Sequence, residues 1–336
     1  MILLRTSVRC LVSVLVYGAL CRNGFSQDIE GVSKPGMEPQ GSLWSRPGED
    51  WPAFLGPTGN GRSELRGMVV PWPETGPKIC WAIELGEGYC GPSVSKGRAV
   101  VFDRLDGAER LRCVKAETGE VLWEETSSTG YVDMFGYDGG PRSSPILCDG
   151  YVITYGAEGL LACRRLADGS LQWKIKTGKE FHVIPNFFGV GASPVVYKRT
   201  SGSQRKLVIV QVGGSGSDES PADPQRLDLV KGFDSGLVAF DIENGREVWR
   251  TSSELASYST PLLHAFDGQV RLLAWMRDRL LLVDPESGVV KDSFFGEQKN
   301  CLVLLLPAQS FMGLKCFCLK HMVQGVCSLV LRMIRS

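Results

Sequence analysis

The sequence predicts an all-β fold, because three observations point to short strands joined by turns. The chain of 336 residues contains 40 Gly and 18 Pro, a content typical of many turns. The central part of the chain shows no convincing helical stripe of apolar residues. A turn glycine followed four residues later by Trp recurs along the chain, and a Pro-containing signature precedes each copy. Together these features predict repeated units of four strands.

The first 26 residues have the pattern of an export signal. They contain three arginines, no acidic residue and a ten-residue apolar run. Gly24 and Ser26 then place small residues where a signal peptidase cleaves. The apolar run is too short to span a membrane, so we expect a signal peptide at residues 1–26. Cys21 allows a second interpretation, a lipoprotein anchor, although Leu20 is a poor residue directly before a lipidated cysteine.

The Gly-to-Trp signature occurs three times with the same spacing. The three copies are Gly119 with Trp123, Gly169 with Trp173 and Gly245 with Trp249, and a fourth copy keeps Gly288 without a Trp. Glycine supplies the positive φ that a tight hairpin turn requires. Tryptophan offers a broad apolar face, and we expect it to pack between neighbouring units at the end of an outer strand.

Short apolar runs between these signatures supply the remaining strands of each unit. The clearest runs are Ala99 to Phe102, Tyr151 to Tyr155, Leu207 to Val212 and Val270 to Trp275. Units of roughly 40–50 residues with four strands have the size of propeller blades. We therefore expect an N-terminal approach segment over residues 27–76 and about four blades over residues 77–297.

Several of these segments resemble the pyrroloquinoline-quinone (PQQ) repeat. The nearest copy runs from Leu237 through Gly245 to Trp249. The chain is similar to exported bacterial PQQ-like propellers related to the outer-membrane assembly factor lipoprotein. The segments that carry this similarity are Trp51–Pro57, Gly140–Pro145, Leu207–Gly214 and Ala256–Pro261. The resemblance, which covers roughly residues 50–297, implies a β-propeller of four-stranded PQQ-like blades that is incomplete with about four blades.

Residues 298–336 depart from the repeat pattern. They contain five basic residues, no acidic residue and four of the eleven cysteines, and they lack the turn signature. A shifted reading frame would explain such an atypical basic tail rich in Cys and Leu, and a membrane-associated tail is the alternative. Residues 27–297 hold 29 basic and 37 acidic side chains, a net charge of −8. A chain without an excess of basic residues is not expected to bind nucleic acid.

The resemblance implies a non-catalytic binding or scaffolding propeller of the bacterial periplasm or cell envelope. We expect its partner to be an envelope protein or peptide. An alternative is an oxidoreductase that uses PQQ and calcium, and a further alternative is a polysaccharide-binding module. The chain has no pair of adjacent cysteines, and no segment matches the catalytic residues of the quinoprotein dehydrogenases. We therefore predict no cofactor, no metal site and no catalytic residue, and membrane association only through an anchor or the tail.

Other motifs favour packing over chemistry. Cys113 and Cys163 each stand six residues before a turn glycine, where the third unit has Ala239, so a small apolar slot inside the blade explains them. The run Gly213–Gly216 leads into an acidic, Pro-containing stretch in which no helix can start cleanly, so a phosphate-binding loop is not indicated.

The candidate binding residues lie in the links between units. In a propeller, the links from an outer strand to the next inner strand collect around one mouth of the central channel. Two such links, residues 131–138 and 181–188, are rich in aromatic and polar residues. The candidate residues of this channel mouth are Tyr131, Asp133, Tyr137, Arg142, His182, Asn186, Phe187 and Tyr258. These links form either a ligand or peptide surface or packed loops between blades.

Overall fold

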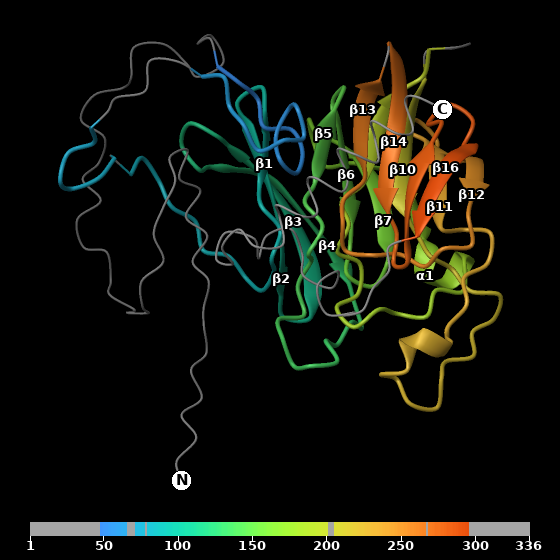
Figure 1. Cartoon of the computed structure of the whole chain (residues 1–336). Helices are drawn as coiled ribbons and strands as arrows, with labels where there is room; N and C mark the ends of the chain where they lie inside the picture. Colours follow the sequence, from blue (N-terminus) through green and yellow to red (C-terminus); the bar gives the residue numbers. More distant parts are fainter. Residues whose placement is uncertain (1–47, 66–70, 78, 201–204, 267, 296–336) are drawn as a thin grey trace.

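Four antiparallel sheets of four strands each make up almost all of the ordered structure (Figure 1). The computed structural model describes residues 48–65, 71–77, 79–200, 205–266 and 268–295. Within each sheet the strands follow one another in chain order from the inside of the molecule outward, so each sheet is a propeller blade. The predicted all-β propeller class is confirmed, whereas the predicted signal peptide and tail lie outside the described residues.

The blades take the following bounds. The first blade contains β1 Ser93–Ser95, β2 Arg98–Leu105, β3 Ala108–Lys115 and β4 Val121–Ser128. The second contains β5 Ile146–Cys148, β6 Tyr151–Tyr155, β7 Leu160–Arg165 and β8 Leu171–Lys176. The third contains β9 Val195–Lys198, β10 Lys206–Gln211, β11 Leu237–Asp241 and β12 Glu247–Thr251. The fourth contains β13 Leu262–Phe266, β14 Gln269–Trp275, β15 Arg279–Val283 and β16 Val290–Phe295. The described helices are the single turns α1 Thr177–Glu180 and η2 Leu227–Leu229.

The core lies between the blades. Apolar side chains of β6 and β7 pack against those of β10 and β11, and the other face of β10 and β11 packs against the fourth blade. The buried strands β2, β6, β10 and β11 carry nearly continuous runs of Val, Ile, Leu and Phe, because both of their faces are covered.

Each signature tryptophan lies inside its outer strand, so the expectation that the strand ends there is wrong. Trp123 is the third residue of β4, which continues to Ser128. The strands continue because their residues still find ladder partners on the preceding strand. Opposite the three tryptophans stand Cys113, Cys163 and Ala239, which are small and fully buried, in agreement with the predicted apolar slot.

The tryptophans connect each blade to the next blade through the turn glycine of that neighbour. The indole of Trp173 in the second blade donates a 2.7 Å hydrogen bond to the Ile242 carbonyl of the third. Its ring covers Gly245, where an added Cβ would lie 2.7 Å from the ring. The same contact joins Trp81 to Gly119, Trp123 to Gly169 and Trp249 to Gly288. All four glycines have positive φ, the conformation expected of these turns.

A second contact joins the inner strands through the Pro-containing signatures. The backbone N–H directly before each proline donates to a hydroxyl at the equivalent position of the next blade. Gly91 donates to Ser144 at 3.2 Å, Ser144 to Ser193 at 3.0 Å, and Ser193 to Thr260 at 3.0 Å. The outer tryptophan contact and the inner hydroxyl contact both run from one blade to the following one. Each junction between blades is therefore fixed both near the propeller axis and far from it.

The motif at Trp51 packs inside the innermost strands. Trp51 and Val94 of β1 exchange two backbone hydrogen bonds of 2.8 Å. The carbonyl of Pro52 accepts a hydrogen bond from the Leu147 N–H in β5. This segment of the predicted approach region therefore lines the first two blades near the centre, at the end of the molecule where β1 and β5 are labelled in Figure 1.

Candidate functional site

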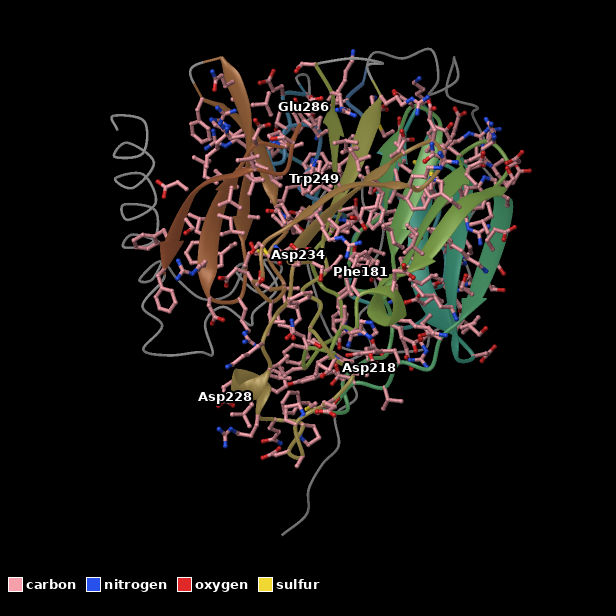
Figure 2. All side chains as sticks on the ribbon, turned by 90° about the vertical axis from the view of Figure 1, so that its right-hand side faces the viewer. Phe181, Asp218, Asp228, Asp234, Trp249 and Glu286 are labelled. Atoms are coloured by element: carbon pink, nitrogen blue, oxygen red, sulfur yellow. The ribbon has the colours of Figure 1, made fainter. Side chains whose placement is uncertain are left out.

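The connections between strands divide into two groups at opposite ends of the blades. The links from each outer strand to the next inner strand share one end with the β2–β3, β6–β7, β10–β11 and β14–β15 connections. In Figure 1 this end, which includes α1, lies at the bottom. Figure 2 places Asp218 and Asp228 at this end and Glu286 at the other. We call it the loop face, and it holds the predicted channel-mouth residues.

Asp133 organises the first link, which joins β4 to β5. Its buried carboxylate accepts hydrogen bonds from the backbone N–H groups of Phe135 at 2.9 Å and Tyr137 at 3.2 Å. It also pairs with the Arg142 guanidinium at 2.8 Å. That guanidinium lies between the rings of Tyr131 and Tyr89, 4.8 and 5.3 Å from their centroids. Asp133, Arg142 and Tyr131 are buried and committed to one another, so they position the link.

The second link, which joins β8 to β9, is tied to the β10–β11 connection. The exposed His182 ring contacts the Asp218 carboxylate at 2.8 Å, and the His182 carbonyl accepts a hydrogen bond from the Ser215 hydroxyl. Asn186 donates from its amide to the Ala256 carbonyl at 2.8 Å. These contacts fix the link against two further loops, and the partner of His182 is a carboxylate of the same chain.

Aromatic side chains of the two links meet Tyr258 of the β12–β13 link in one cluster of rings: Phe135, Tyr137, Phe187, Phe188 and Tyr258. Together with the exposed Val132 and Met134 of the first link, they form what we call the aromatic patch. The ring of Phe135 lies 5.6 Å from that of Phe187 and 5.7 Å from that of Phe188. Phe188 also contacts Tyr137 at 5.9 Å and Tyr258 at 5.5 Å. Tyr258 is buried, whereas Val132, Phe135 and Tyr137 are 82%, 51% and 61% exposed.

Sequence reasoning missed several members of this site. Val132, Met134, Phe135 and Phe188 lie within the two segments that it selected, yet they were not chosen as candidates. Their apolar character in segments without strand alternation could have indicated them. Apolar residues in such a segment either fill a core or remain exposed as a binding surface. Trp81 was also missed, although it stands 42 residues before Trp123, a blade-sized interval.

Glu109 is a buried carboxylate at the contact of the first two blades. Its Oε1 accepts a 2.8 Å hydrogen bond from the Ala157 N–H in the β6–β7 connection. The pKa of Glu109 is raised to about 7, chiefly by burial and also by the neighbouring Glu158, against the lowering effects of the Ala157 hydrogen bond, Arg104 and Arg142. Its sequence context, an acid in an otherwise alternating strand, gave no signal of this burial.

A cavity of about 320 Å³ opens beside the aromatic patch. Its walls come from the second link, the β6–β7 connection, residues 255–257, and the start and the η2 part of the β10–β11 connection. Tyr131 and Asn186 line it among the predicted residues. Among the described residues that line it, Glu158 is the only carboxylate, and it already accepts hydrogen bonds from Thr129 and Gly130. This donor set does not fit a quinone held by a calcium ion, which needs several free oxygen ligands.

The blade pattern and the fold can be placed among known proteins. The family described as outer membrane protein assembly factor BamB matches residues 63–218 and 107–294. The chain belongs to this family. A curated relative, the outer membrane protein assembly factor BamB of Moranella endobia (strain PCIT), is 24% identical over 257 residues, covering 66% of this chain and 61% of the relative. This chain therefore spans about three fifths of that BamB protein's length.

Two solved structures show lower similarity. BamB from Moraxella catarrhalis is 18% identical, with a TM-score of 0.39 over 65% of this chain and 56% of its own. The quinohemoprotein alcohol dehydrogenase ADHIIG from Pseudomonas putida HK5 is 19% identical, with a TM-score of 0.42 over 62% of this chain and 34% of its own. Neither similarity bears on activity.

Two further observations concern the part of this BamB-family chain that the structure describes. In that part, no group of three or more His, Cys, Asp or Glu side chains is placed to hold a metal ion. Across the same residues, no helix is long and apolar enough to cross a membrane. Its five described cysteines, Cys80, Cys90, Cys113, Cys148 and Cys163, are free.

Proposed function

We propose that this chain is a non-catalytic binding or scaffolding propeller, exported to the bacterial periplasm or cell envelope, that holds a partner protein on its loop face. The family's description as an outer membrane protein assembly factor supports this proposal. So does the charge of residues 27–297, which disfavours nucleic acid as the partner.

The observation that carries the proposal is the aromatic patch. Exposed aromatic and aliphatic side chains gathered on one surface mark sites of protein association. These side chains stand on links fixed by buried pairs such as Asp133 with Arg142, so little ordering is required when a partner binds. Tyrosine and phenylalanine offer a large contact area with only two side-chain torsions each, which suits a preformed binding surface.

A photo-crosslinking experiment in cells tests the proposal. Tyr137 is replaced by p-benzoylphenylalanine, and a matched chain carries the same group at Val289, which is 50% exposed beside the turn that precedes β16. We expect the group at position 137 to crosslink to an envelope protein and the group at position 289 not to do so. Phe135→Ser in the first chain should weaken that crosslink while the protein stays folded. Equal crosslinking at both positions, or none from a folded chain, would contradict the proposal.

The two alternatives are tested with the same protein. Reconstitution with PQQ and calcium, followed by dye reduction in the presence of alcohols, would identify a quinoprotein oxidoreductase. Retention on immobilised envelope polysaccharide that is lost in Phe187→Ala would identify a carbohydrate-binding module. The proposed protein-binding function expects neither result.

A further inference from the structure

The cavity beside the aromatic patch has an apolar body. The apolar side chains in its wall include Val183, Ile184, Val190, Leu227, Val230 and Leu255. Its neutral polar groups are already satisfied within the chain. The Tyr155 hydroxyl bonds to that of Thr177 at 2.9 Å, and the Gln211 amide donates to the Ser259 carbonyl at 2.7 Å. A group that enters this cavity therefore gains most by being apolar.

The rim of the cavity is basic although residues 27–297 as a whole are acidic. Lys176, Lys179 and Arg277 line the cavity together with a single acid, Glu158. Arg277 donates to the Leu227 and Val230 carbonyls, and Glu158 accepts from Thr129 and Gly130. Lys176 and Lys179 are exposed, and no hydrogen bond or ion pair to either is found among the residues that the structure describes. Their charges are available to an anionic group at the mouth.

The size and surroundings of the cavity favour a polypeptide over a free small molecule. About 320 Å³ lies at the low end for ligand pockets, and it suits one or two side chains. Asn186 lines the cavity, and the next two residues, Phe187 and Phe188, belong to the aromatic patch, so the surface continues beyond the cavity. A bound chain could therefore insert one side chain and lay its neighbours across the patch.

We infer that this cavity receives an apolar side chain of the partner protein, with an acidic residue next to it in the partner's sequence that pairs with Lys176 and Lys179. The inference rests on the proposed function and names the chemistry of the partner segment. The aromatic patch supplies contact area, the cavity selects the apolar side chain, and the two lysines select the adjacent carboxylate.

Two fluorescein-labelled heptapeptides test the inference by fluorescence anisotropy with the full chain at low ionic strength. One carries Gly-Ser-Leu-Phe-Asp-Gly-Ser, and the other replaces its Asp by Asn. We expect the acidic peptide to bind about 2- to 10-fold more tightly, the size of one or two exposed ion pairs. The double variant Lys176→Glu, Lys179→Glu should remove that difference. Lys174→Glu, a single charge reversal of the same kind at an exposed position of β8 outside the cavity, should preserve it.

The other outcomes overturn the inference or the proposed function, and they separate the two. Equal affinities for the two peptides, or an equal loss in Lys174→Glu, would show that no specific lysine pair reads the carboxylate. Displacement of the acidic peptide by PQQ with calcium, or by decanoate at lower concentration than by unlabelled peptide, would assign the cavity to a different ligand. If neither peptide binds while position 137 still crosslinks, the inference fails and the proposed function stands. If the acidic peptide binds as expected without any crosslink, the proposed function fails.

Discussion

At the scale of single residues, Glu109 couples protonation to the contact between the first two blades. Its carboxyl faces Glu158, Arg104 and Arg142, and burial raises its pKa from an ordinary 4.5 to about 7. The folded chain therefore holds this proton more tightly than the unfolded chain does. The resulting stabilisation is complete below about pH 4.5 and is lost as the pH rises through 7.

Glu109→Gln keeps an oxygen that can accept the Ala157 N–H and removes the buried charge. We expect the variant to exceed the wild type in free energy of unfolding by about 2 kcal/mol at pH 8, and to match it near pH 5. Urea unfolding at both pH values measures this difference. Glu120→Gln, at an exposed turn position, serves as the control and should show no such dependence. Parallel curves for wild type and Glu109→Gln would contradict the raised pKa.

Gly245 combines a positive φ of 69° with close contact to the Trp173 ring. Gly150 has a φ of 80° and no atom within 4 Å of an added Cβ, so it isolates the backbone cost. We expect Gly150→Ala to lower the free energy of unfolding by about 1 kcal/mol. Gly245→Ala should lower it by about 2–4 kcal/mol, because the indole must also shift away from the Ile242 carbonyl. Thermal unfolding of both variants checks that Gly245→Ala is the more destabilising. Equal losses would show that the Trp173 ring moves aside without a cost in free energy.

At the scale of elements, the β10–β11 connection is a structured insertion. Its turn η2 contributes Leu227, which packs with Val230 and Leu255. Arg277 from the β14–β15 connection donates to the Leu227 carbonyl at 2.7 Å and to the Val230 carbonyl at 3.2 Å. The wall of the cavity therefore depends on one arginine from the neighbouring blade.

Arg277→Ala should release η2 without unfolding the blades. We expect thermolysin to cleave near Leu227 several-fold faster than in the wild type, while the midpoint of thermal unfolding changes little. Arg226→Ala is the matched control, since Arg226 pairs with the exposed Asp228 of the same insertion. Similar cleavage rates in both variants would show that Arg277 does not hold the insertion.

The sequence allowed the repeating elements to be predicted, because turn glycines and β-branched strands are local signals. The residue that each tryptophan contacts could not be predicted from such local signals. Trp173 meets Ile242, 69 residues later, across a junction that exists only when two blades are packed. The exposure of Phe135 and Tyr137 and the burial of Asp133 depend on such packing as well. The sequence therefore identified the links, but not which of their residues are buried and hold the link in place and which are exposed for binding.

At the scale of the whole molecule, the proposed binding surface occupies one end and leaves the other free. Hydrogen exchange with and without the crosslinked partner tests this asymmetry. We expect added protection in residues 131–138 and 181–188 on the loop face. The β1–β2 and β5–β6 turns at the opposite end should exchange unchanged. Protection confined to those turns would place the partner at the wrong end for the proposed function.

The paired contacts at each junction also give the propeller a direction. The first three blades each present an indole and a backbone N–H forward, and the second, third and fourth each receive them with a turn glycine and a hydroxyl. If the second blade were excised, Trp123 would meet Gly245 with the chemistry it now finds at Gly169. The described blades thus share one type of interface. Insertion or deletion of a whole blade during evolution would therefore not require a new interface between its neighbours.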